Sequence, residues 1–171
     1  MIKVGDTLPE ATLTEFFDVE GNGCSLGPNS FDIHKATAGK KIAIFGLPGA
    51  YTPTCSAKHV PSYLEHAAAL RTAGLDEIWC VSVNDAFVMG AWGRDQKTAG
   101  VVRMMADGSA VFSQATGLTL DLTARGMGIR SDRYSMLVAD GVVKNLNREA
   151  PGKFEVSDGA TMLKQAQQLL V

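Results

Sequence analysis

Short apolar runs alternate with longer mixed segments along the chain, a pattern typical of strands that alternate with helices. Runs rich in β-branched and aromatic residues, bounded by glycine or polar residues, predict buried strands. Asp140-Gly141 separates two further apolar runs and predicts a tight hairpin, because this pair suits a two-residue turn. The predicted strands are residues 41–45, 78–83 and 101–106, and the predicted hairpin strands are 134–139 and 142–147.

Capping residues and glycines predict the helices between these strands. Thr52-Pro53 is a good helix start, because a threonine hydroxyl can accept an amide hydrogen bond and proline suits the first helical position. Pro61 falls inside this first helix and is expected to bend it, since proline removes a backbone donor. The predicted helices are residues 52–72 before Gly74, residues 84 or 85 to 97 closed by Gly100, residues 109–116 before Gly117, and a last helix capped by Ser157.

This order of elements predicts an α/β protein. It is β-α-β-α-β, followed by an antiparallel hairpin and a final helix. A central mixed β-sheet flanked by helices accounts for the order, and a thioredoxin-like fold is the economical choice. The length of 171 residues favours one domain that covers residues 1–171.

Composition narrows the classes of function. The net charge of -2 gives no electrostatic reason to expect a nucleic-acid partner. No apolar run approaches the roughly 20 residues of a membrane span, and the segment from Met1 to Asp6 lacks the apolar centre of a signal peptide. The 3 cysteines are too few, and odd in number, for a disulfide framework. We therefore expect a cytoplasmic protein in a reducing compartment.

Cys55 is the main candidate for chemistry. With Thr52 as the N-cap, Cys55 lies in the first helical turn, where unpaired amides and the helix dipole favour a thiolate. Lowering a thiol pKa from ~8.5 to ~6 takes about 3.4 kcal/mol, whereas a helix end supplies about 2 kcal/mol at best. We therefore expect a nearby cation, and arginine suits because it stays charged and donates in two directions. A buried structural cysteine remains the alternative, and these residues alone do not identify an oxidant.

Other kinds of site have less support. Cys55 and His59 are one helical turn apart, but no second pair at ligand spacing accompanies them, so we expect no metal. The chain has no Cys-x-x-Cys motif, and the loop before Cys55 lacks the Gly-Lys-Ser/Thr ending of a phosphate loop, so we expect no cofactor. A redox sensor that uses Cys55 stays open. A cysteine hydrolase would need a positioned histidine base, and His59 on the same helix is badly placed for that role.

The stretch PGAYTPTCS, residues 48–56, resembles the active-site signature of the peroxiredoxins, Pro-x-x-x-Thr-x-x-Cys. More narrowly, FGLPGAYTPTCSAKHVPSY, VSVNDAFVMGAWG and RYSMLVADGVVKNLN resemble the type II ("five") branch, and the similarity runs through nearly the whole chain. The resemblance implies a thioredoxin-like fold and a thiol peroxidase that reduces hydrogen peroxide and organic hydroperoxides. It also implies a sulfenic acid intermediate, reduction by glutathione with glutaredoxin or by thioredoxin, and a homodimer.

The resemblance also implies roles for individual residues. Cys55 would be the peroxidatic nucleophile, and Thr52 would hydrogen-bond the thiolate and the substrate oxygen. Pro48 would shield the pocket from water. The expected cation would be Arg133, although Arg130 and Arg125 are close in sequence and composition alone does not choose among the three.

The remaining cysteines have weaker assignments. Cys80 matches the position that plant members use as a resolving cysteine, but its place in the apolar run IWCVSV predicts a core residue. Val156 occupies the position that matches the C-terminal resolving cysteine of the animal type, so that pathway is absent. Cys24 is expected to be an exposed loop thiol. We therefore expect an external thiol, rather than Cys80, to reduce oxidised Cys55.

Overall fold

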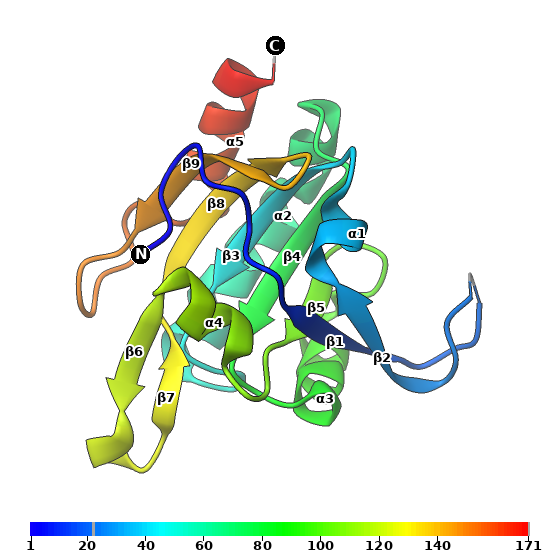
Figure 1. Cartoon of the computed structure of the whole chain (residues 1–171), viewed down its shortest axis with the longest axis vertical. Helices are drawn as coiled ribbons and strands as arrows, with labels where there is room; N and C mark the ends of the chain where they lie inside the picture. The colour runs from blue at the N-terminus through cyan, green and yellow to red at the C-terminus, as the bar shows by residue number, and fades with distance from the viewer. Residues whose placement is uncertain (22, 171) are drawn as a thin grey trace.

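A seven-stranded mixed β-sheet runs through the centre of the computed structural model, which describes residues 1–21 and 23–170 (Figure 1). The strand order is β2-β1-β5-β4-β3-β8-β9; β3, β4 and β5 are parallel, and the outer strands are antiparallel to their neighbours. This confirms the predicted mixed sheet, although β5 begins two residues later than expected. The strands are β1 (Thr12–Phe17), β2 (Gly27–Asp32), β3 (Lys41–Gly46), β4 (Glu77–Ser82), β5 (Arg103–Ala106), β8 (Tyr134–Ala139) and β9 (Val142–Arg148).

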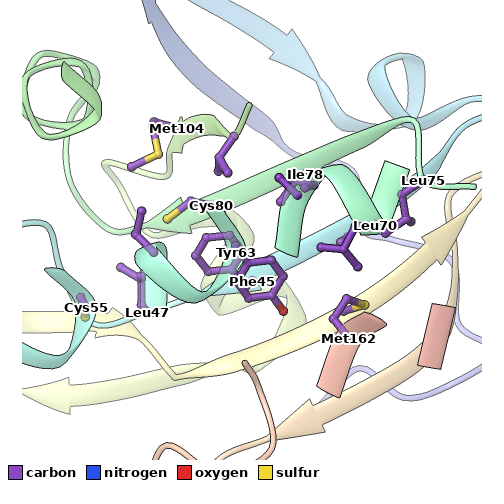
Figure 2. Close-up of a cluster of buried hydrophobic side chains, with 14 of the residues drawn as sticks. Phe45, Leu47, Cys55, Tyr63, Leu70, Leu75, Ile78, Cys80, Met104 and Met162 are labelled. Carbon is purple, nitrogen blue, oxygen red and sulfur yellow. The ribbon is translucent and has the colours of Figure 1, made fainter. Parts of the chain in front are cut away.

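Helices cover both faces of this sheet, with α1 and α4 on one face and α2, α3 and α5 on the other (Figure 1). Successive strand residues point to opposite faces, so each strand contributes to two core clusters. Phe45 and Cys80 pack toward α2, α3 and α5 (Figure 2), whereas Ile44 and Trp79 pack toward α1 and α4. The helices are α1 (Ile33–Thr37), α2 (Val60–Thr72), α3 (Ala86–Gln96), α4 (Val111–Thr116) and α5 (Gly159–Leu169).

Two hairpins follow α4. The β8–β9 hairpin turns at Asp140 and Gly141, whose φ angles of 49° and 75° are both left-handed, which confirms the predicted two-residue turn. The other hairpin consists of β6 (Thr119–Leu122), the short 3-10 turn η2 (Thr123–Arg125) and β7 (Gly128–Ser131). It projects from the main body as an arm that the apolar pattern did not predict (Figure 1).

The boundaries of α3 differ slightly from those expected. Asp85, not Asn84, is the N-cap, because the Asp85 carboxylate accepts the amide hydrogen bond of Val88 at 2.9 Å. The helix closes at Lys97, which adopts a left-handed φ of 58°, so Gly100 lies beyond the helix end.

The N-cap predicted for the last helix is wrong. Asp158, rather than Ser157, precedes α5. The amide and hydroxyl of Ser157 both donate to the buried Glu149 carboxylate, at 2.9 and 2.7 Å, so this serine holds the preceding turn instead of capping the helix.

Candidate active site

The loop that carries Cys55 begins where the central strand β3 ends. Gly46 closes β3 against the ring of Tyr134, and a Cβ at this position would collide with that ring. The loop is tied to the neighbouring parallel strand, because the Leu47 amide donates to the Val81 carbonyl at 3.2 Å. These contacts place the loop at the carboxyl end of parallel strands, the edge where open α/β sheets commonly bind ligands.

Cys55 lies in a π-helical turn, η1 (Cys55–His59), which leads directly into α2. The amide of Val60 donates to the Cys55 carbonyl, five residues back, and Pro61 follows with no amide hydrogen to continue the α-helical pattern. The Cys55 side chain is fully buried. The predicted helix irregularity therefore takes the form of a π turn that begins at the cysteine itself.

The outer side of this loop is fastened to α3. Tyr51 has a left-handed φ of 63°, and its hydroxyl donates to Asp95 at 2.7 Å. The indole of Trp92 donates to the Ser56 hydroxyl at 3.1 Å, directly after the cysteine. A strained non-glycine residue held by such contacts is typical of functional loops.

Arg133 is the cation that the structure brings to Cys55. Its Nη2 donates to Cys55 Sγ at 3.2 Å. The pairing of β3 with β8 explains this contact, because Gly46 is opposite Tyr134, so the residue before β8 lies beside the loop that leaves β3. A guanidinium at this distance donates a charge-assisted hydrogen bond to the sulfur.

The other two predicted arginines lie near the site but make no hydrogen bond to Cys55: Arg125 lines the same cavity as Arg133. Arg130 donates to the backbone carbonyls of Met127, Pro48 and Val83, at 2.8, 3.4 and 3.3 Å, and so supports the loops around the site. Arg125 is exposed at the tip of the β6–β7 arm.

The predicted helix cap at Thr52 is wrong in its hydrogen bonding. The Thr52 hydroxyl donates to the Gly49 carbonyl at 2.7 Å, and the same carbonyl accepts the Thr52 amide at 3.4 Å. The loop thus forms a tight turn before Pro53, and the hydroxyl hydrogen of Thr52 is used in the hydrogen bond to Gly49.

Thr52 and Pro48 line a cavity of about 1000 Å³ that also reaches Arg133. The β6–β7 arm supplies the apolar wall of this cavity, with side chains that had no signal in the apolar pattern. These arm residues are Leu120, Leu122, Ala124 and Met127.

His59 is the second neighbour of Arg133. Arg133 Nη1 lies 2.9 Å from His59 Nδ1, and His59 Nε2 lies 3.0 Å from the Ser157 carbonyl oxygen. Burial, aided by the positive charge of Arg133, lowers the pKa of His59 to about 3. The imidazole is therefore neutral at neutral pH, and it cannot share a metal with Cys55 without losing these contacts.

Cys80 is a core residue, as its apolar run predicted. It lies on β4 between Phe45 of β3 and Met104 of β5, and it is fully buried (Figure 2). Burial, reinforced by the nearby Cys55, raises the pKa of the Cys80 thiol well above its ordinary value, although Arg133 opposes this. Cys24 is half-buried in a turn rather than exposed as expected. All three thiols are free.

In the part of the chain that the structure describes, no helix has both the length and the apolar character to cross a bilayer.

Comparisons with known proteins agree with this geometry. The Redoxin family model matches residues 3–163. Peroxiredoxin-2B of Arabidopsis thaliana is 44% identical over 163 residues, which cover 95% of this chain and 97% of the relative.

Two crystal structures share the fold. Reduced Prx3 of Vibrio vulnificus in complex with hydrogen peroxide is 45% identical, with a TM-score of 0.89 over 97% of this chain and 99% of the other. A candidate thioredoxin reductase from Burkholderia cenocepacia is 68% identical, with a TM-score of 0.95 over 96% of this chain and 97% of the other. The chain has the thioredoxin-like fold of these neighbours and belongs to the peroxiredoxin family, within the redoxins, in agreement with the type II branch.

Proposed function

We propose that this peroxiredoxin reduces hydroperoxides at Cys55, through a cysteine sulfenic acid that an external thiol then reduces. The contact between Arg133 Nη2 and Cys55 Sγ is the observation that carries the proposal. It places a permanent cation on a buried sulfur beside a cavity, which is the arrangement that a thiolate nucleophile requires.

In the first step, the Cys55 thiolate attacks one oxygen of the hydroperoxide and the O–O bond breaks. The attacked oxygen stays on sulfur as the sulfenic acid, and the other oxygen leaves as hydroxide or alkoxide and takes up a proton to become water or an alcohol. Arg133 is placed to stabilise both the thiolate and the charge that develops on the leaving oxygen.

Thr52 and Pro48 are proposed to complete the substrate site. Because the Thr52 hydroxyl donates its hydrogen to Gly49, its oxygen lone pairs are available to accept the O–H hydrogen of the hydroperoxide. Pro48 lines the same cavity and would limit the access of water. The cavity volume and its apolar wall support organic hydroperoxides as substrates in addition to hydrogen peroxide.

In the second step, a thiol attacks the sulfenic acid, releases water and forms a mixed disulfide, which a second thiol cleaves to restore Cys55. We propose glutathione with glutaredoxin, or thioredoxin, as the source of these thiols. The burial of Cys80 and the raised pKa of its thiol support an external reductant, since a thiol attacks as its thiolate.

We propose further that the protein is a cytoplasmic homodimer. The sparse, unpaired cysteines support a reducing compartment. The exposed aromatic ring of Tyr51, in the active-site loop, supports a partner surface there.

Steady-state peroxide consumption with a thiol reductant tests the function. Cys55→Ser should abolish turnover, whereas Cys24→Ser should leave it nearly intact, because Cys55 has the Arg133 contact and Cys24 lies in a distant turn. Wild-type protein should consume many equivalents of peroxide. A redox sensor would stall after one equivalent, and substantial turnover by Cys55→Ser would end the proposal.

A further inference from the structure

Arg133 has a second side-chain contact that the proposed reaction does not use. One nitrogen of its guanidinium contacts Cys55, and the other contacts His59 Nδ1 at 2.9 Å. We infer that His59 is a positioning residue, which holds the guanidinium of Arg133 in the orientation that directs one N–H at the Cys55 sulfur. This inference rests on the proposed function of Cys55 and specifies how its cation is held.

The two contacts of the imidazole determine its protonation state. An arginine can only donate, so His59 Nδ1 must be unprotonated and accept from Arg133. A backbone carbonyl can only accept, so His59 Nε2 must carry the hydrogen and donate to Ser157. Only the neutral Nε2–H tautomer satisfies both contacts, and the lowered pKa of His59 agrees with that neutral form.

The carbonyl that selects this tautomer is itself held by a small network. The Ser157 carbonyl also accepts a hydrogen bond from the Tyr63 hydroxyl at 3.0 Å. The Glu149 carboxylate fixes the turn that carries it, because it accepts the amides of residues 155, 156 and 157 at 2.9 Å each. The charged groups that face His59 are therefore Arg133 on one side and, through this turn, Glu149 on the other.

Packing keeps the imidazole ring from turning. Its centroid lies 4.9 Å from the ring of Phe45 and 5.0 Å from the ring of Phe154, and the side chain is fully buried. A rigid acceptor on the inner side of Arg133 matters because the same arginine lines the cavity, where water and substrate oxygens compete for its N–H groups. Because the guanidinium is planar and rigid, holding Nη1 at His59 also fixes the direction in which Nη2 points toward the sulfur of Cys55.

Three substitutions, His59→Asn, His59→Gln and His59→Phe, separate positioning from packing. His59→Asn places an amide oxygen close to the Nδ1 position and can still accept from Arg133, whereas His59→Gln places its amide near Nε2 and keeps only the partner at Ser157. We expect Asn to preserve peroxide attack and the pH of half-maximal iodoacetamide alkylation at Cys55 better than Gln or Phe. Gln and Phe should slow peroxide attack by about tenfold or more, the range expected for losing one charge-assisted hydrogen bond.

Stability and a matched histidine provide the controls. Thermal melts of the three variants show whether activity follows fold stability. His66→Asn changes a histidine inside α2, the helix that follows η1, and the ring of His66 bonds the backbone carbonyl of Ser62. His66→Asn should leave the alkylation profile unchanged. The inference would be overturned if the rates of peroxide attack fell in parallel with the melting temperatures. It would also be overturned if His59→Asn reacted with peroxide no faster than His59→Gln. Wild-type rates in all His59 variants, with Cys55→Ser inactive, would reject the inference and leave the proposed function standing.

Discussion

At the scale of single residues, the distinction among the arginines is the sharpest feature of the site. Arg133 donates a hydrogen bond to the sulfur of Cys55, whereas the guanidinium of Arg130 donates to backbone carbonyls. A lone helix end supplies about 2 kcal/mol at best toward a thiolate, so the cation should account for much of the reactivity. Arg130 and Arg133 lie three positions apart in the sequence, so substitutions at the two positions can be compared directly.

Arg133→Gln should move the pH of half-maximal iodoacetamide alkylation at Cys55 upward, because the thiolate loses its cation. It should also slow peroxide attack by about 100-fold or more, the range measured when one donor to a developing oxyanion is removed. Arg130→Gln should change the alkylation profile far less, since its contacts are to loop carbonyls. An unchanged profile for Arg133→Gln, with a shifted one for Arg130→Gln, would transfer the role to the neighbour.

At the scale of elements, the parts that the sequence predicted well are those with strong local signals. β3 and β4 are continuous apolar runs, and the β8–β9 hairpin turns at Asp-Gly. β2 has the polar sequence GPNSFD, and β6 and β7 are four residues each and mostly half-buried, so the apolar pattern did not mark them. Their pairing depends on contacts between neighbouring strands, which local periodicity does not carry.

The same limit applies to the site. The residues around Cys55 are contiguous, so the helix-end chemistry could be predicted from the sequence. Choosing Arg133 from the residues alone was not possible, because the choice depends on the register between β3 and β8. The acceptor role of His59 depends on a contact 74 residues away in sequence, which no local pattern contains.

The strand position of Cys80 leads to a prediction about resolution of the oxidised cysteine. Cys80 is held within the sheet between two strands and is fully buried. A disulfide requires the two Cα atoms within about 7 Å in a suitable orientation, so we expect a Cys55–Cys80 bond to require unwinding of η1. Cys80→Ser should therefore keep most turnover with glutathione and glutaredoxin. Peroxide without a thiol should produce sulfenic and then sulfinic acid at Cys55, seen by intact mass and peptide mapping. A quantitative Cys55–Cys80 disulfide within one chain, with turnover lost in Cys80→Ser, would contradict this.

At the scale of the whole molecule, the site is assembled from segments that lie far apart in the sequence. Its nucleophile follows β3, its cation precedes β8, and its histidine is held by the turn before α5. Every one of these segments packs against the central sheet or on α2, so the geometry of the site depends on the global fold. That residues 1–171 act as one domain stays a prediction, and it agrees with this dependence.

A buried neutral histidine makes global stability depend on pH, and the sign follows from the two pKa values. The ordinary histidine pKa is 6.5, whereas that of His59 in the folded protein is about 3, so between these pH values the unfolded chain binds a proton that the native protein does not. The free energy of unfolding should then fall as the pH falls, by up to about 1.4 kcal/mol per pH unit from this residue.

Glu149 contributes to the pH dependence in the same direction as His59, but in a lower pH window. Burial opposes ionisation of Glu149, yet its hydrogen bonds from Ser157 and the neighbouring amides lower its pKa below the ordinary 4.5, so its contribution is lost only as the pH falls below that value. Urea unfolding between pH 6.5 and pH 5 therefore avoids the window of Glu149. Burial raises the pKa of Glu15, which acts in the opposite direction, so the contribution of His59 is taken from the difference between wild type and a His59 variant over the same pH range. His59→Phe should flatten the dependence of the unfolding free energy on pH in this window, whereas His66→Asn should retain it. An equal slope in wild type and His59→Phe would show that His59 is protonated in the native protein, and its role as an acceptor for Arg133 would fail with it.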